Sequence, residues 1–138
     1  MAKILLAEDD GFSRDMLTRR LERQGFEMVA VPDGREALHA ARTEKPDLIL
    51  MDLEMPVMDG RAAMSALRSD PRTFRIPIIV LTAHTAPEDV AKAIEAGCHS
   101  YETKPIALRR LVERIHEALG AKPGPNVAAA PADPVPGP

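Results

Sequence analysis

The chain has 138 residues, 45% of them hydrophobic, which suits a single domain with one aliphatic core. Its net charge of −3, from 18 basic and 21 acidic residues, gives no basic field that would attract nucleic acid or an acidic membrane. The lone Cys98 excludes an internal disulfide, and no signal peptide or membrane-spanning run is present, so we expect a cytoplasmic protein.

Short apolar runs alternate along the chain with segments of helical periodicity. In chain order the pattern predicts a strand over 3–7, a helix over 12–24, a strand over 27–31, a helix between 34 and 46, a strand over 48–51, a helix around 62–67, a strand over 76–81, a helix over 87–96, a strand over 100–103 and a helix over 108–119. Asp10 or Ser13 is the expected cap of the first helix, and Gly25 its stop.

Five strand and helix units in strict alternation predict an α/β fold, a doubly wound five-stranded parallel sheet with helices on both faces. We assign this domain to residues 1–120. From Ala121 the composition becomes Pro, Ala and Gly with few charges or bulky apolar residues, so 121–138 is expected to be a disordered tail.

Polar residues recur where the predicted strands end. Glu8 and Asp9 follow the first strand, Asp52 the third, Thr82 the fourth and Lys104 the fifth. A lone Asp at such a place often only caps a loop, but these groups should meet at one edge of the sheet, where parallel sheets bind ligands. Crowded carboxylates need a cation, and Mg²⁺ with oxygen ligands fits. The set predicts phosphoryl transfer with Asp52 as nucleophile.

The sequence resembles the receiver domains of two-component response regulators over residues 3–119. The resemblance rests on four motifs, which are Leu-Leu-Ala-Glu-Asp-Asp, Met-Asp-Leu-Glu-Met-Pro-Val-Met-Asp-Gly, Leu-Thr-Ala and Tyr-Glu-Thr-Lys-Pro. It implies a flavodoxin-like sheet with the strand order 2-1-3-4-5.

The resemblance also implies a role for each motif residue. Asp52 would accept a phosphoryl group from a sensor histidine kinase or a histidine phosphotransfer protein. Asp9, Asp52 and the backbone carbonyl of Glu54 would bind Mg²⁺, with Glu8 acting through water. Lys104 would hold the acyl phosphate. Thr82 would move toward the phosphate as a switch, and Tyr101 would rotate inward with it.

Several residues have two interpretations. Asp10 is interpreted as a solvated cap, not as a metal ligand. Glu102 stands where many family members have an apolar residue, and we expect an exposed edge-strand charge that deters aggregation. His84 and Glu54 would either tune the lifetime of the phosphate or remain solvated loop residues. His39, His99 and His116 lack metal-ligand spacing, and Cys98 lacks a nucleophile's context.

We therefore expect a stand-alone response regulator that signals through protein contacts and is not a dedicated enzyme. A Mg²⁺-dependent phosphohydrolase with an aspartyl nucleophile and a degenerate receiver used only for binding are the alternatives. Kinase docking is expected at Ser13, Arg14, Met16, Pro105 and Ile106, although Met16 would equally suit the core. Output, as a monomer or a weak phosphorylation-enhanced homodimer, is expected through Ala91, Glu95, Tyr101, Glu102 and Arg109, without the tail.

Overall fold

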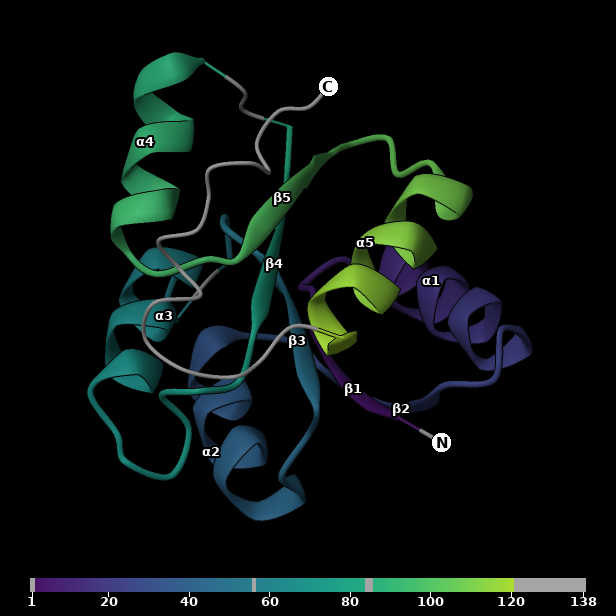
Figure 1. Cartoon of the computed structure of the whole chain (residues 1–138), viewed down its shortest axis with the longest axis horizontal. Coiled ribbons are helices and arrows are strands. Elements are labelled where there is room, and N and C mark those ends of the chain that lie inside the picture. Colours follow the sequence, from purple (N-terminus) through teal and green to yellow (C-terminus); the bar gives the residue numbers. More distant parts are fainter. Residues whose placement is uncertain (1, 56, 84–85, 121–138) are drawn as a thin grey trace.

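A computed structural model describes residues 2–55, 57–83 and 86–120. Its elements are β1 (Lys3–Ala7), α1 (Gly11–Arg23), β2 (Glu27–Val31), α2 (Gly34–Glu44), β3 (Leu48–Asp52), α3 (Gly60–Arg68), β4 (Ile78–Thr82), α4 (Pro87–Glu95), β5 (Ser100–Thr103) and α5 (Leu108–Gly120). The five strands form one parallel sheet in the order β2-β1-β3-β4-β5 (Figure 1). The predicted fold class and strand order are confirmed.

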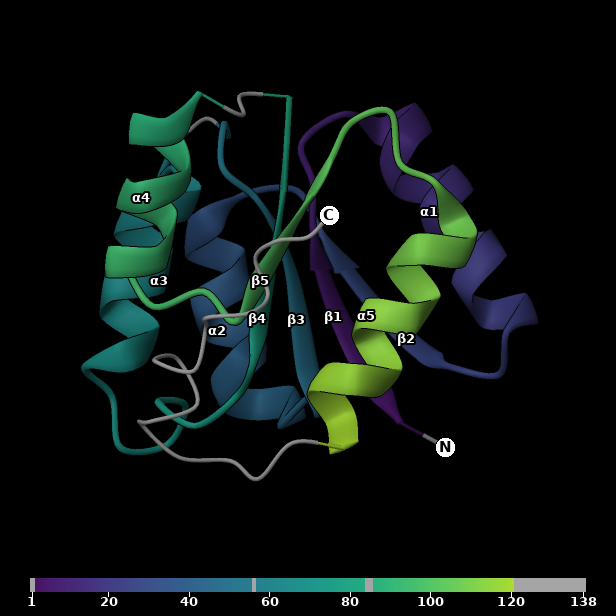
Figure 2. The ribbon, with the colours of Figure 1, turned by 45° about the horizontal axis from the view of Figure 1, so that its top comes forward.

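Helices cover both faces of the sheet. Helices α2, α3 and α4 lie on one face, and α1 and α5 lie on the other (Figure 2). Successive residues of a strand point to opposite faces, so Leu5 and Ile49 pack toward the first group while Leu6 and Leu50 pack toward the second. Both faces of the central strands are therefore buried, which explains why their sequences are continuous apolar runs.

Aspartates fix where three helices begin. Asp10, Asp33 and Asp59 each accept a hydrogen bond from the backbone N–H three residues further on, at 2.8, 2.9 and 3.0 Å. The cap of α1 is thus Asp10 and not Ser13. Gly25 follows this helix with φ of +98°, a conformation that favours glycine. These caps place the helix starts at the carboxyl edge of the sheet.

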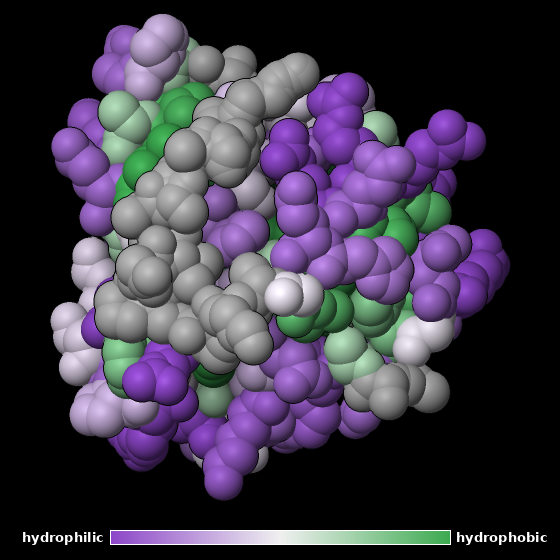
Figure 3. Space-filling model, viewed as in Figure 1, coloured by the Kyte–Doolittle hydropathy of each residue, from purple (hydrophilic) through white to green (hydrophobic). Residues whose placement is uncertain are grey.

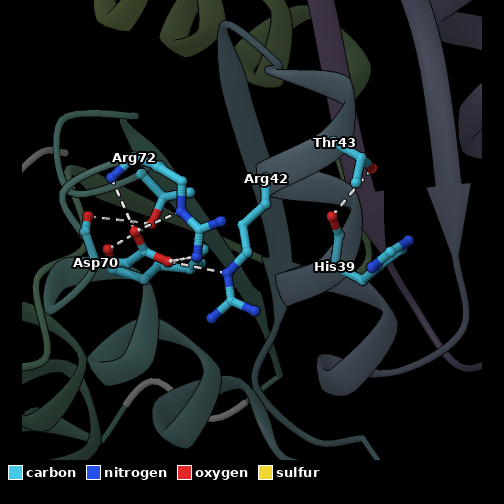
Figure 4. Close-up of polar contacts among 7 residues, drawn as sticks. His39, Arg42, Thr43, Asp70 and Arg72 are labelled. Atoms are coloured by element: carbon cyan, nitrogen blue, oxygen red, sulfur yellow. Dashed lines mark hydrogen bonds and ion pairs between the residues drawn. The ribbon is translucent and has the colours of Figure 1, made fainter.

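A charged cluster lies at the opposite, amino edge. The carboxylate of Asp70, in the segment between α3 and β4, accepts hydrogen bonds from Arg42 of α2 and from Arg72 (Figure 4). The Arg72 side chain, followed by its backbone N–H and then Arg42, holds the pKa of Asp70 well below its usual range. The cluster joins α2 to the segment that precedes β4.

Two expectations about side-chain burial are wrong. Glu102 is only 2% exposed and forms an ion pair with Arg114. The reason is that α5 covers the face of β5 to which the side chain of residue 102 points, although β5 is the last strand of the sheet. Phe12 shares the helical spacing of Met16, Leu17 and Leu21, which favours an apolar stripe on the first helix, but it is 72% exposed.

Element boundaries differ from the predicted ones by small shifts. The fourth strand begins at Ile78 instead of residue 76, since Pro77 has no N–H to donate to a sheet ladder. None of the helices in the described ranges is long and apolar enough to cross a bilayer. The segment 121–138, expected to be disordered, and His84 lie outside the described residues.

Candidate functional site

Four adjacent strands bring the predicted polar residues to one edge. Glu8 directly follows β1, Asp52 ends β3, Thr82 ends β4 and Lys104 directly follows β5. Asp52 lies beside Leu81 in the register of β3 and β4, one residue before Thr82. Glu8, Asp52 and Thr82 are 3–4% exposed, so the strand ends hold polar groups within the protein.

Lys104 links the carboxylates at this edge. Its Nζ lies 3.0 Å from Oε1 of Glu8 and 3.3 Å from Oδ2 of Asp52. The other Glu8 oxygen accepts a hydrogen bond from the backbone N–H of Asp10 at 3.1 Å. The backbone N–H of Glu54 donates to Oδ1 of Asp52 at 3.2 Å. The site therefore fixes the orientation of both buried carboxylates.

The environment shifts the pKa of two of these groups. Burial raises the pKa of Glu8, and the hydrogen bonds from Asp10 and Lys104 only partly oppose that shift. Burial would lower the pKa of Lys104, but the hydrogen bond to Glu8 and the charges of Asp52 and Glu8 outweigh it, so the pKa of Lys104 is raised. The lysine accordingly stays protonated at neutral pH, where it can pair with an anion.

The carboxylates also fit a divalent cation. One oxygen from each of Glu8, Asp9 and Asp52 lies within 4.8 Å of the other two, and Asp9 is exposed to solvent. Three carboxylates at such distances repel, and one lysine offsets only part of that charge. Oxygen ligands on one side and solvent on the other suit Mg²⁺, which keeps several bound waters and leaves coordination positions for phosphate oxygens.

The loop after β3 packs tightly against Asp52. The N–H of Gly60 donates to the carbonyl of Leu53 at 2.8 Å. A Cβ at Gly60 would lie 2.5 Å from the Asp52 carbonyl oxygen, which no side chain tolerates. Val57 in the same loop has φ of +69°, an uncommon and strained conformation for a β-branched residue.

The residues expected to dock a kinase lie beside the site, with one difference. Ser13, Met16, Pro105 and Ile106 line a hollow of about 490 Å³ that begins at Glu8 and Lys104. Met16 is only partly buried and is not part of either core cluster. Arg14 does not line this hollow. Its guanidinium donates to the carbonyls of Glu8 at 2.8 Å and Asp9 at 3.4 Å, and so holds the loop that presents both acids.

The expected output residues are spread over α4, β5 and α5. Ala91, Glu95 and Arg109 are exposed, and Tyr101 is half-buried against the core cluster beneath α2, α3 and α4. Glu102 is not available to a partner because it is buried with Arg114. Among the described residues, Phe12 and Val57 are large apolar side chains that are exposed, and the sequence predicted no functional role for either of them.

This fold and site define a class of protein: a doubly wound domain that presents a buried aspartate, an acidic cluster and a lysine at the carboxyl edge of its sheet. The chain belongs to the response regulator receiver domain family, whose pattern it matches over residues 4–116. Receiver domains are generally signalling phosphoacceptors rather than dedicated enzymes. They interact with histidine kinases or phosphotransfer proteins, and they typically bind Mg²⁺ at an acidic pocket.

Individual relatives agree with this assignment. The chain is similar to the DNA-binding response regulator MtrA of Mycolicibacterium paratuberculosis, at 38% identity over 85% of this chain, and it spans about half (51%) of that relative's length. It is also similar to the polar-differentiation response regulator DivK of Brucella anthropi, at 33% identity over 85% of this chain and 95% of DivK.

A solved structure gives the same result in three dimensions. The receiver domain of the sensor histidine kinase PA1611 from Pseudomonas aeruginosa superposes with a TM-score of 0.82 at 32% identity. The match covers 87% of this chain and 98% of that domain, which holds a magnesium ion in its active site cleft.

Proposed function

We propose that this chain receives a phosphoryl group on Asp52 from a phosphohistidine of a sensor kinase or a phosphotransfer protein. The observation that supports this most is the position of the Asp52 carboxylate, buried at the end of β3, 3.3 Å from Lys104 and within 4.8 Å of an oxygen of Glu8 and of Asp9. The carboxylate attacks phosphorus, the P–N bond to the imidazole breaks, and an acyl phosphate forms.

The surrounding residues have distinct roles in this proposal. Asp9, Asp52 and the backbone carbonyl of Glu54 would hold Mg²⁺, and Glu8 would act on it through water. A bound Mg²⁺ supplies charge compensation for the phosphoryl oxygens. Lys104, already oriented by Glu8 at 3.0 Å, pairs with a phosphoryl oxygen once the new group is in place.

The signal leaves through a conformational switch. Phosphorylation adds negative charge and strong hydrogen-bond acceptors at the end of β3, beside the neighbouring strand β4, which ends at Thr82. Thr82 moves toward the phosphate and Tyr101 of the neighbouring β5 follows, which alters the surface that α4, β5 and α5 present to a protein partner or a second copy. Because such coupling is typically about 1–3 kcal/mol, the change is a shift of population.

Replacement of the acceptor tests the proposal. Asp52→Asn should abolish labelling both by acetyl phosphate with Mg²⁺ and by a phosphorylated histidine phosphotransfer domain. Asp59→Asn is the matched control, because Asp59 is an exposed aspartate of the same loop that caps α3 and should label normally. Label that persists on another residue in Asp52→Asn would disprove the assignment.

Output through α4, β5 and α5 requires a separate test. Sedimentation of the full chain and of a 1–120 truncation, each with and without beryllofluoride and Mg²⁺, should give the same small increase in association upon activation. Association of the full chain alone would show that residues 121–138 take part, contrary to the proposal.

A further inference from the structure

A basic hollow lies at the amino edge of the sheet, opposite the edge that carries the phosphorylation site. Its volume is about 430 Å³, and it is lined by Arg42, Lys45, Pro46, Arg72 and Ile76. The first three belong to the end of α2 and the turn after it, and the other two to the segment between α3 and β4 (Figure 2). A hollow of this size can hold a small molecule. We call it the amino-edge hollow.

Asp70 holds the two arginines of this hollow in place. Its Oδ1 accepts hydrogen bonds from the backbone N–H and from Nε of Arg72, at 2.8 and 3.1 Å. Its Oδ2 accepts from Nη2 of Arg72 and from Nε of Arg42, both at 2.9 Å. The terminal nitrogens of Arg42 point away from Asp70 (Figure 4), and within the described chain they donate no hydrogen bond. Both guanidinium groups are therefore oriented and keep N–H groups for another anion.

Positive charge exceeds negative charge at the amino-edge hollow. Arg42, Lys45 and Arg72 contribute three positive charges, and Asp70 contributes one negative charge, in a chain whose net charge is −3. Lys45 is exposed, and among the described residues it has no ion-pair partner. The carbonyl end of α2 supplies a partial negative charge of only about one half. Most of the excess of two positive charges is therefore left for a bound anion.

The rest of the lining is apolar and lies within a hydrophilic surface. Pro46 is buried and Ile76 is half-buried. Hydrophilic side chains predominate in the lower part of Figure 3, where α2 ends and the segment between α3 and β4 runs. Among the described residues, the large apolar side chains that are exposed are Phe12 and Val57, which belong to the opposite edge. This distribution favours a soluble ligand over a lipid headgroup, because membrane binding needs apolar side chains to insert.

We propose that the amino-edge hollow binds a soluble phosphate monoester, with the phosphate held by its three cationic side chains and the organic part against Pro46 and Ile76. The dianionic phosphate group matches the excess of two positive charges, whereas a single carboxylate would match only one. Its terminal oxygens can accept hydrogen bonds from both guanidinium groups and from the ammonium group at the same time. The site is separate from Asp52, from which the whole length of β3 divides it, so the proposal does not depend on phosphotransfer.

A titration followed by nuclear magnetic resonance tests this site. The probe is adenosine 5′-monophosphate, added to the full ¹⁵N-labelled chain in buffer with a chelator, so that no Mg²⁺ occupies the acidic site. The amide signals of Lys45, Arg72 and Ile76 should shift and saturate. Inorganic phosphate should shift the same signals more weakly, adenosine should not shift them, and about 0.5 M NaCl should weaken binding of the nucleotide.

Charge-removing variants identify the side chains that hold the phosphate. Lys45→Gln and Arg72→Gln should each weaken binding of adenosine 5′-monophosphate about fivefold or more, because each removes a charged hydrogen-bond donor. Lys92→Gln is the matched control, since it removes the same charge at an exposed position on α4, and its affinity should stay within twofold of the wild type. Unshifted amide signals away from the substitution show that each variant is folded.

Several results would overturn the proposal. The site is not an anion site if neither the nucleotide nor inorganic phosphate gives saturable shifts, or if the shifts centre on Lys104 at the other edge. The assignment of the side chains is wrong if Lys45→Gln and Arg72→Gln bind as tightly as Lys92→Gln. If a polyglutamate peptide shifts the same signals and binds more tightly than the nucleotide, the hollow is a docking surface for an acidic protein and not a site for a phosphate monoester.

Discussion

Removal of one partner from the buried ion pair between Glu102 and Arg114 should weaken the packing of α5 on β5. The Glu102 side chain is 2% exposed and that of Arg114 is 20% exposed. Arg114→Met removes the cation and leaves a carboxylate without a counter-charge beneath the helix. Removal of one partner from a buried pair typically costs about 3–5 kcal/mol. Since Arg114 keeps some contact with water, we expect about 3 kcal/mol, the low end of that range.

The cost should come from the unpaired charge and not from the lost side chain. The double variant Glu102→Leu/Arg114→Met replaces both charges with apolar groups, so its free energy of unfolding should lie within about 1 kcal/mol of the wild type. Urea denaturation followed by far-ultraviolet circular dichroism measures these values, because the chain has no tryptophan for fluorescence.

Arg110→Met is the matched control on the same helix. Arg110 is exposed, and its replacement should change the free energy of unfolding by no more than about 0.5 kcal/mol. The reasoning is refuted if Arg114→Met costs as little as Arg110→Met, or if the double variant is less stable than Arg114→Met alone.

Three further predictions concern the site and its support. Asp9→Asn should weaken Mg²⁺ binding, measured by calorimetry, about tenfold or more, whereas Asp10→Asn should have little effect because Asp10 caps α1; equal losses would exchange their roles. Gly60→Ala should destabilise the protein by roughly 1–3 kcal/mol in urea, because its Cβ would meet the Asp52 carbonyl; an unchanged midpoint would contradict this. Arg72 and Arg42 lower the pKa of Asp70, so the ionised carboxylate stabilises the folded state at pH values above the pKa of Asp70 in the unfolded chain. The stability advantage of the wild type over Asp70→Asn should therefore shrink as the pH falls below that value. A difference that does not change with pH would show that Asp70 is not paired with these arginines in solution.

The sequence alone determined the fold class and the position of each candidate site residue along the chain. Continuous apolar runs such as Leu48–Met51 indicated strands buried on both faces, and their alternation with helices restricted the sheet to a parallel, doubly wound form. In such a sheet every strand ends at the same edge, so Glu8, Asp52 and Lys104 had to lie near one another.

Tertiary structure decided which side chains are buried and which are paired. The sequence around position 102 predicts an outer strand, but α5 covers the Glu102 side chain. Its partner Arg114 lies twelve residues further along the chain, so no local sequence pattern could predict this ion pair. Phe12 fits the helical spacing of core residues, yet its side chain is 72% exposed. Local periodicity sets which way a side chain points from its own element, whereas its burial depends on what other elements place there.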